Sequence, residues 1–266
     1  MSCSVVITRS GAKAVLDSEV GEVMHPVVGP LVEAPRLYVN PSRLKERLRS
    51  EGSPLVLLDV GLGAASNAIT AWWISEQLST NDRRLEIVSL DRTLEALQAA
   101  LTAPDDFLLQ GEAGIAARAL LERGVHETAR TSWRYIEGEL PGLLDTLPAG
   151  YDVVYWDMYS ASDNPTLWSV SAFRSLRRLC RQGCTVHTYS GATAIRSALL
   201  LAGFSVGLGP AIDEKKHGTT ATVGASLDSP LDARWLQRLT RSSAPLPADA
   251  PPDALQIISS AAQFQL

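Results

Sequence analysis

The sequence predicts an α/β protein, with a mostly parallel sheet and helices on both faces of that sheet. Three observations favour this fold class. From residue 54 onward, short apolar runs alternate with segments of helical apolar spacing, which is typical of βαβ units. Several of these runs end in an acid, at the position where ligands bind along the carboxyl edge of a parallel sheet. The chain of 266 residues is also long enough for one such domain with elaborations.

Each element is expected from the spacing of its apolar residues. Residues 42–48 form a short helix, because Leu44 and Leu48 lie one turn apart. The neighbouring run 37–39 has the character of a short strand. Strands are expected at 54–60, 85–90, 133–136, 152–156 and 185–189. Helices are expected at 65–78, 94–101, 113–123, 168–181 and 192–202, and residues 204–206 are expected to pair antiparallel with 221–223.

Three regions are expected along the chain. Residues 1–50 form an N-terminal extension packed on the core, 51–230 a Rossmann-like domain, and 231–266 a Pro/Ala-rich tail. No apolar run approaches the roughly 20 residues that span a bilayer. The three cysteines and four histidines follow no metal-ligand spacing. These features predict a cytoplasmic protein without a membrane partner or a bound metal. The formal net charge of −5 argues against a dedicated nucleic-acid-binding protein, in which a basic surface is typical.

The first candidate site follows the strand at 54–60. Asp59 and Val60 precede Gly61-Leu62-Gly63, and these glycines let the backbone turn sharply and approach a ligand at a helix N-terminus. The dinucleotide fingerprint requires a third glycine at the position of Ser66, which weakens the nicotinamide interpretation. An acid beside the loop suits S-adenosylmethionine, which carries a cationic amino group and no pyrophosphate. A tight turn without a ligand remains the alternative.

Two more acids follow the next strands. Asp91 ends the strand at 85–90, where an acid commonly accepts hydrogen bonds from ribose hydroxyls. A cap of the following helix is the alternative role of Asp91. Glu139, after the strand at 133–136, is placed to reach an adenine amino group, or is simply an exposed loop acid.

The strand at 152–156 delivers Asp157 to the same edge of the sheet. A carboxylate there can accept a hydrogen bond or a proton from a substrate amine that attacks a methyl group. Tyr159 can stack on a planar base, Asn164 shapes the following loop, and Tyr189 ends the strand at 185–189 beside the expected cleft. A turn or cap acid is the alternative role of Asp157.

These residues together resemble a known family, the methyltransferase half of the bifunctional tRNA 5-methylaminomethyl-2-thiouridine biosynthesis protein (MnmC-like), including stand-alone forms without the flavin oxidoreductase domain. The resemblance covers nearly the whole chain, and its most specific part is the Asp157 strand end with Asn164-Pro165-x-x-Trp168. The other matching segments are Asp59-Val60-Gly61-Leu62-Gly63, Asp91, Gly138-Glu139, Thr188-Tyr189-Ser190, Ala192-x-x-x-Arg196-x-x-Leu199, His25-Pro26-x-x-Gly29-Pro30-x-x-Glu33 and Gln263-Phe264.

The resemblance implies an S-adenosylmethionine-dependent N-methyltransferase that acts on the aminomethyl group of the wobble uridine of tRNA. It implies that a separate flavin oxidoreductase, or other enzymes that form the aminomethyl group, act upstream as partners. The cofactor-binding residues would be Asp59, Gly61, Gly63, Asn67, Asp91 and Glu139. Asp157 would be the catalytic residue, and Tyr159, Asn164 and Tyr189 would bind the substrate.

The sequence departs from the family pattern at Ala65, where a third glycine is usual, and at Asp163, where a lysine is common. Asp163 removes a positive charge near the expected RNA entrance, so a small-molecule amine is an alternative substrate. A nicotinamide-dependent oxidoreductase and a non-catalytic RNA-binding relative are two further alternatives.

Overall fold

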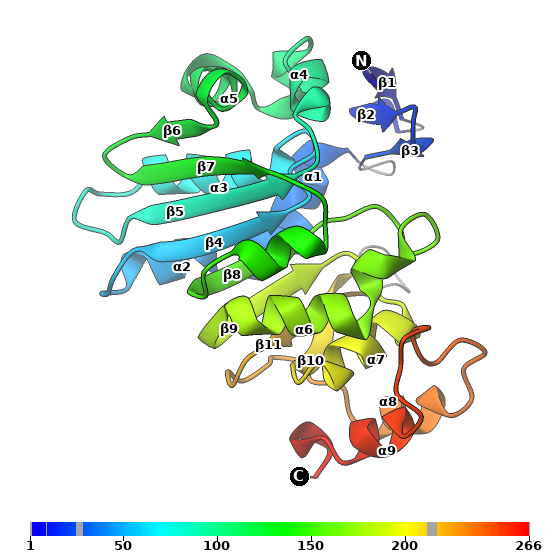
Figure 1. Cartoon of the computed structure of the whole chain (residues 1–266). Coiled ribbons are helices and arrows are strands. Elements are labelled where there is room, and N and C mark those ends of the chain that lie inside the picture. Colours follow the sequence, from blue (N-terminus) through cyan, green and yellow to red (C-terminus); the bar gives the residue numbers. More distant parts are fainter. Residues whose placement is uncertain (1, 9, 25–28, 212–216, 266) are drawn as a thin grey trace. The chain divides into compact units, whose positions relative to one another are not determined.

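The computed structural model describes residues 2–8, 10–24, 29–211 and 217–265. His25 and Pro26 of the predicted motif lie outside the described residues. The chain divides into two compact units: Met1–Glu139 with Val154–Asp157, and Leu140–Val153 with Met158–Leu266. Eight of the described strands belong to the main sheet, and helices surround it, which confirms the predicted α/β class (Figure 1). The domain boundaries expected at residues 50 and 230 remain a prediction.

The first unit contains the parallel part of the sheet. Its strands follow the order β8, β4, β5, β7, β6. β4 (Leu55–Val60) pairs parallel with β5 (Leu85–Asp91), and β5 pairs parallel with β7 (Thr131–Glu137). The short β6 (Val125–Glu127), which the sequence did not predict, pairs antiparallel with β7 at the edge. Val154–Trp156 of β8 (Tyr151–Trp156) belongs to this unit, where Asp157 N donates to Val60 O at 2.9 Å.

Helical segments pack on one another beside these strands. α3 (Ser66–Glu76) contacts β5 and β7, and it also contacts α1 (Pro30–Ala34), η1 (Pro35–Val39) and α2 (Leu44–Arg49). β4 is buried along nearly its whole length, as is usual for a parallel strand covered on both faces. The other helices of the unit are α4 (Glu95–Ala100), the 3₁₀ turn η2 (Pro104–Phe107) and α5 (Gly111–Arg123).

Two predictions for the N-terminal region were wrong or incomplete. Residues 37–39 do not form a strand, because they lie in the π-helical turn η1, in which Asn40 N donates to Pro35 O at 2.9 Å. Leu37, Tyr38 and Val39 are all buried, whereas a strand would direct successive side chains to opposite faces. A small antiparallel sheet was missed, formed by β1 (Cys3–Ile7), β2 (Lys13–Asp17) and β3 (Glu22–Val23); β1 and β2 contact α4.

In the second unit the strands of the sheet follow the order β10, β11, β9, β8. β9 (Cys180–Thr188) pairs antiparallel with β11 (His217–Thr222), which pairs antiparallel with β10 (Ser205–Ala211). Val206 lies opposite Ala221, so the predicted terminal pair is confirmed. The helical segments are η3 (Gly142–Thr146), η4 (Pro165–Trp168), α6 (Val170–Leu179), α7 (Thr193–Leu201), α8 (Ala233–Leu239), α9 (Ala254–Ser259) and η5 (Ala262–Phe264).

The C-terminal segment is held to α6 by one side chain. The Asp249 carboxylate accepts hydrogen bonds from Val170 N at 3.0 Å and Ser171 N at 2.9 Å, and the Ser169 hydroxyl accepts from Ala172 N. Three N–H groups of the first helical turn are thereby satisfied, and the negative charge lies at the favourable end of the helix dipole. Across the described residues, no helix combines the length and apolar character that crossing a membrane would require.

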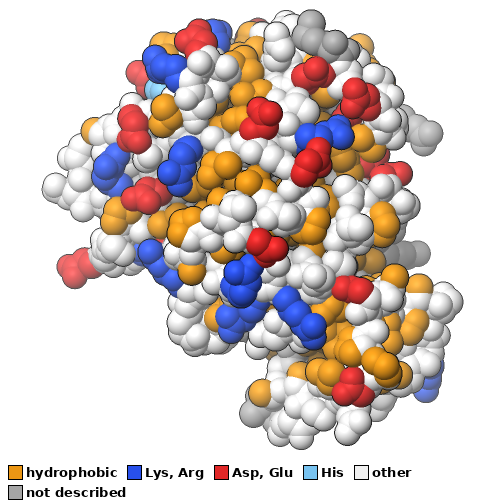
Figure 2. Space-filling model, in the orientation of Figure 1, with side chains coloured by type: hydrophobic (Ala, Val, Ile, Leu, Met, Phe, Trp, Pro, Cys, Tyr) orange, Lys and Arg blue, Asp and Glu red, His pale blue; other side chains and the backbone are white. Residues whose placement is uncertain are grey.

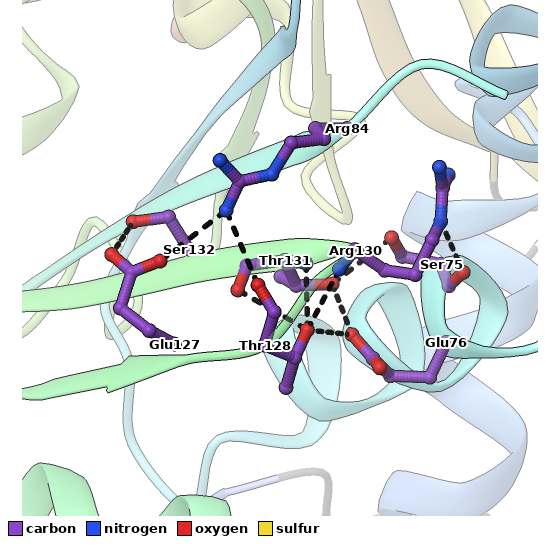
Figure 3. Close-up of polar contacts among 8 residues, drawn as sticks. All are labelled: Ser75, Glu76, Arg84, Glu127, Thr128, Arg130, Thr131 and Ser132. Carbon is purple, nitrogen blue, oxygen red and sulfur yellow. Dashed lines mark hydrogen bonds and ion pairs between the residues drawn. The ribbon is translucent and has the colours of Figure 1, made fainter. Parts of the chain in front are cut away.

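A buried arginine closes the end of α3 in the first unit (Figure 3). Arg130 is 3% exposed, and its guanidinium donates to Ser75 O at 3.3 Å, to Asp82 O at 2.6 Å and to Arg83 O. Arg130 lies in the hairpin formed by β6 and β7. Thr128 and Thr131 of this hairpin donate hydrogen bonds from their hydroxyls to Glu76. Because the last carbonyls of a helix lack partners within the helix, Arg130 supplies a donor to the buried Ser75 carbonyl and ties the end of α3 to Asp82 and Arg83.

Replacing Arg130 with methionine is expected to lower the free energy of unfolding by about 3 kcal/mol, because the buried Ser75 carbonyl and two partly buried carbonyls lose their charged donor. Urea unfolding of the wild type and the variant measures this change. Arg84→Met is the control, since Arg84 is a half-exposed arginine that pairs with Glu127 at 3.3 Å, and its loss is expected to cost at most about 1 kcal/mol. Equal losses in the two variants would contradict the capping role of Arg130.

Candidate active site

The loop between β4 and α3 turns through residues with positive φ. Gly61 has φ 88°, Gly63 has φ 51° and Ala65 has φ 65°, and L residues other than glycine rarely adopt this conformation. The amides of Gly61 and Leu62 both donate to Leu90 O, at 3.0 and 3.1 Å, which fixes the loop to the end of β5. Ala65 therefore adopts the backbone conformation for which the family usually has glycine, and the departure at this position leaves the turn intact.

Asp59 lies in a buried polar chain that crosses three strands. Trp133 Nε1 on β7 donates to Ser89 Oγ on β5 at 3.0 Å, and Ser89 Oγ donates to Asp59 Oδ2 on β4 at 2.8 Å. All three residues are at most 1% exposed, and Asp59 Oδ1 has no hydrogen-bond partner among the described residues. Burial is the main cause that raises the pKa of Asp59 to about 8; the Ser89 hydrogen bond opposes this rise, and the charges of Asp157 and Asp91 add to it. Asp59 is thus a buried carboxyl group that favours the protonated state more than an exposed aspartate does.

Asp91 connects the end of β5 to the glycine loop. Its Oδ2 accepts from Gly63 N at 2.9 Å and its Oδ1 accepts from Arg92 N at 2.7 Å. Burial raises the pKa of Asp91, while these backbone donors oppose the rise. The N-cap of α4 is Leu94, so the alternative role of Asp91 as a helix cap is not observed. Because each carboxylate oxygen can accept more than one hydrogen bond, these contacts are compatible with the predicted ribose contact.

Asp157 is held by two side chains from different segments of the first unit. Tyr38 Oη donates to Asp157 Oδ1 at 2.6 Å, and Asn67 Nδ2 donates to Asp157 Oδ2 at 2.7 Å. Tyr38 comes from η1 and Asn67 from the first turn of α3. Asn67 Oδ1 is buried without a hydrogen-bond partner among the described residues. The structure thus brings Asn67, predicted to bind cofactor, directly to the predicted catalytic acid.

Glu139 is exposed just beyond the end of β7. The neighbouring Gly138 N donates to Asp91 O at 3.0 Å, which ties this loop to the end of β5. The contact of Glu139 with adenine remains a prediction.

The predicted substrate-binding residues belong to the second unit. Tyr159 O accepts from Trp168 Nε1 at 2.8 Å, and the Trp168 ring meets the Tyr189 ring edge-on at 5.8 Å. Tyr189 Oη donates to Met158 O at 3.1 Å, and Asn164 Oδ1 accepts from Thr166 Oγ1 at 2.8 Å. Asn164 therefore contacts its own loop, and the roles of Asn164, Tyr159 and Tyr189 toward a substrate stay predictions.

Sequence reasoning missed Tyr38, Ser89 and Trp133. Ser89 had a signal, since it is the one hydroxyl in the apolar run of β5, and a buried hydroxyl requires a partner. Tyr38 had a weaker signal, because a buried tyrosine also needs a partner for its hydroxyl. Neither signal identifies that partner, which only the fold provides.

The residues at this edge of the first unit fit a cationic cofactor. Asp59, Asp91 and Asp157 are three carboxyl groups close enough that both other charges raise the pKa of Asp59. The unsatisfied Asp59 Oδ1 and Asn67 Oδ1 are both acceptors. Acceptors and carboxylates suit the ammonium, sulfonium and ribose hydroxyls of S-adenosylmethionine, whereas the pyrophosphate of a nicotinamide cofactor calls for donors.

Comparison with known proteins indicates the same cofactor. A family model described as S-adenosyl-L-methionine-dependent methyltransferase matches residues 118–224. The fold matches the crystal structure of MnmC2 from Aquifex aeolicus with a TM-score of 0.74 and 23% identity, over 98% of this chain and 86% of that chain. The chain is an S-adenosyl-L-methionine-dependent methyltransferase.

Curated relatives resemble this methyltransferase over most of its length. It is 27% identical over 213 residues to the tRNA 5-methylaminomethyl-2-thiouridine biosynthesis bifunctional protein MnmC of Ralstonia nicotianae, covering 75% of this chain and 31% of that protein. It is 25% identical over 240 residues to the MnmC of Pseudomonas putida, covering 85% of this chain and 36% of that protein. The methyltransferase thus spans about a third of the length of these relatives. A spermidine synthase from Thermotoga maritima shares the fold, with a TM-score of 0.51 and 11% identity.

Proposed function

We propose that this methyltransferase transfers a methyl group to the aminomethyl nitrogen of the wobble uridine of tRNA. The observation that carries the proposal is the Asp157 carboxylate, held by Tyr38 and Asn67 beside the glycine loop. A fixed carboxylate close to a cofactor loop can orient an amine and accept the proton that methylation releases. The named activity of the MnmC relatives supports the nucleoside part of the proposal.

The chemistry assigns a separate role to each group. The cofactor, when bound, supplies a methyl group on a positively charged sulfur. A neutral amine that took up this methyl group through its lone pair would become positively charged and would then have to lose one proton. In this scheme Asp157 orients the amine through an N–H hydrogen bond, stabilises the developing charge and accepts the proton.

The remaining predicted residues divide between cofactor and substrate. Gly61, Gly63 and Asn67 would border the amino-acid end of the cofactor, and Asp91 would accept from the ribose hydroxyls. Asp59 would act on the ammonium group from its buried position, and Glu139 would contact adenine. Tyr159, Asn164 and Tyr189 would bind the substrate.

The acidic net charge of the chain affects how tRNA binding should depend on salt. The formal net charge is −5, and Figure 2 shows acidic and basic side chains interspersed on the face in view. We therefore expect tRNA binding to depend on a few local contacts, so that affinity falls only gently with added salt compared with a strongly basic protein.

The test is methyl transfer from labelled S-adenosylmethionine to tRNA that carries the unmethylated aminomethyl group, followed by nucleoside analysis. Label is expected on the wobble uridine alone, and tRNA that is already methylated is the control acceptor. Transfer to a panel of small amines but not to this tRNA would refute the proposal and favour the small-molecule alternative, for which Asp163 and the acidic net charge are the motivation.

A further inference from the structure

Tyr38 is a buried side chain that the predicted site does not include. It is 1% exposed, and it comes from a segment more than a hundred residues before Asp157 in the chain. Its hydroxyl donates to Asp157 Oδ1 at 2.6 Å, a short distance typical of a hydrogen bond to a charged acceptor.

The π-helical turn η1 explains how Tyr38 reaches this position. A π turn contains one more residue than an α turn, and such turns occur frequently at functional sites. The hydrogen bond from Asn40 N to Pro35 O spans five residues, and Ser42 N donates to Tyr38 O at 3.2 Å. The turn is packed against α3. The backbone around Tyr38 is therefore fixed by its own hydrogen bonds and by packing.

Asn67 holds the other oxygen of Asp157, from the helix that follows the glycine loop. The two donors approach different oxygens, so together they define the plane and the rotation of the carboxylate. Fixing the carboxylate in this way is expected to raise the rate of a reaction in which it contacts an amine, because small displacements of a reacting group reduce rates strongly.

We propose that Tyr38 is a positioning residue of the methyl-transfer site, which acts with Asn67 by fixing the Asp157 carboxylate toward the acceptor amine. This inference rests on the proposed function, since it takes Asp157 as the group that meets the amine. The acceptor is accordingly a molecule with a primary amine that can reach Asp157. Tyr38 itself is not assigned a contact with substrate or cofactor.

Tyr38→Phe removes the hydroxyl and keeps the ring, which packs edge-on against Tyr155 at 5.7 Å. Tyr155→Phe is the matched control, because its hydroxyl is equally buried and pairs with Ser42 Oγ at 3.0 Å. In the methyl-transfer assay, kcat of Tyr38→Phe is expected to fall about 10-fold or more. The dissociation constant for S-adenosylhomocysteine is expected to stay within about twofold, and Tyr155→Phe is expected to keep the wild-type kcat within the same range.

Equal kcat in Tyr38→Phe and the wild type would overturn the inference. An equal fall in both phenylalanine variants would also overturn it, since the loss would then come from the packing of the two rings.

A second measurement does not depend on the acceptor. In a double-mutant cycle of Tyr38→Phe and Asp157→Asn, the loss in urea midpoint of the double variant is expected to be smaller than the sum of the two single losses. Additive losses would show that the two side chains are not coupled and would overturn the inference, even if the tRNA proposal were correct. Coupling without methyl transfer to tRNA would refute the proposed function and leave the contact between Tyr38 and Asp157 established.

Discussion

Asp157→Asn is expected to lower kcat for methyl transfer by about 10²- to 10⁴-fold, the range for loss of a general base. Asparagine keeps the shape of the side chain but cannot accept the proton. In the wild type, Tyr38 Oη and Asn67 Nδ2 both donate to the carboxylate. The NH₂ group of asparagine would face one of these two donors and could not accept its hydrogen bond. The measurement is single-turnover transfer of labelled methyl groups at saturating cofactor.

Two comparisons make this result specific. Asp163→Asn changes an exposed acid nearby in the sequence that accepts hydrogen bonds from Ser160 and Ser162, and it is expected to retain activity within about threefold, since it removes only a surface charge. Binding of S-adenosylhomocysteine to Asp157→Asn is expected to stay close to that of the wild type. Full activity in Asp157→Asn would remove Asp157 from the catalytic role.

Asp59→Asn is expected to change how stability depends on pH. The pKa of Asp59 is about 8 in the folded protein, against 3.8 as the reference value. Between these values the folded state holds a proton that the unfolded state has lost, so unfolding releases a proton. The contribution of Asp59 to the free energy of unfolding is therefore fully present below about pH 4. It falls as pH rises, by up to about 1.4 kcal/mol per pH unit, and levels off above about pH 8.

The asparagine variant lacks this titration. Urea unfolding is measured at intervals from pH 5 to pH 9, and the free energy of unfolding is plotted against pH. The wild type is expected to lose stability relative to Asp59→Asn as pH rises, and the two plots are expected to run parallel above about pH 8. Asp106→Asn, which removes the surface partner of Lys13 at 2.8 Å, is expected to follow the wild-type pH dependence. Parallel curves for Asp59→Asn and the wild type over the whole range would show that Asp59 is ionised in the folded protein.

The pattern of strands and helices could be predicted from the sequence because it rests on local periodicity. β4, β5, β7, β8 and β9 lie on the expected apolar runs, and the Gly61–Ala65 turn follows β4 as expected. The N-terminal sheet and the π turn at Pro35–Val39 could not be predicted in this way. Their short apolar runs have no clear period, and tertiary packing decides between strand and helix in such segments.

The acids of the candidate site could be predicted from the sequence, but their hydrogen-bond partners could not. Acids that follow buried strands of a parallel sheet lie at one edge whatever the details of packing, so Asp59, Asp91 and Asp157 could be chosen from the sequence. Their partners could not. Ser89 lies opposite Asp59 only through the register of β4 and β5, and Tyr38 reaches Asp157 only because η1 packs near the end of β8 in the first unit.

Residue type and spacing within a few turns of chain are enough to predict the α/β class, the glycine loop and the acids that end the strands. The folded chain adds that Asn67 and Tyr38 hold Asp157, that Ala65 takes the left-handed conformation, and that Asp59 is buried with one oxygen unsatisfied among the described residues. Hydrogen-bond partners and desolvation depend on which distant segments come together, and local propensity carries no information about that choice.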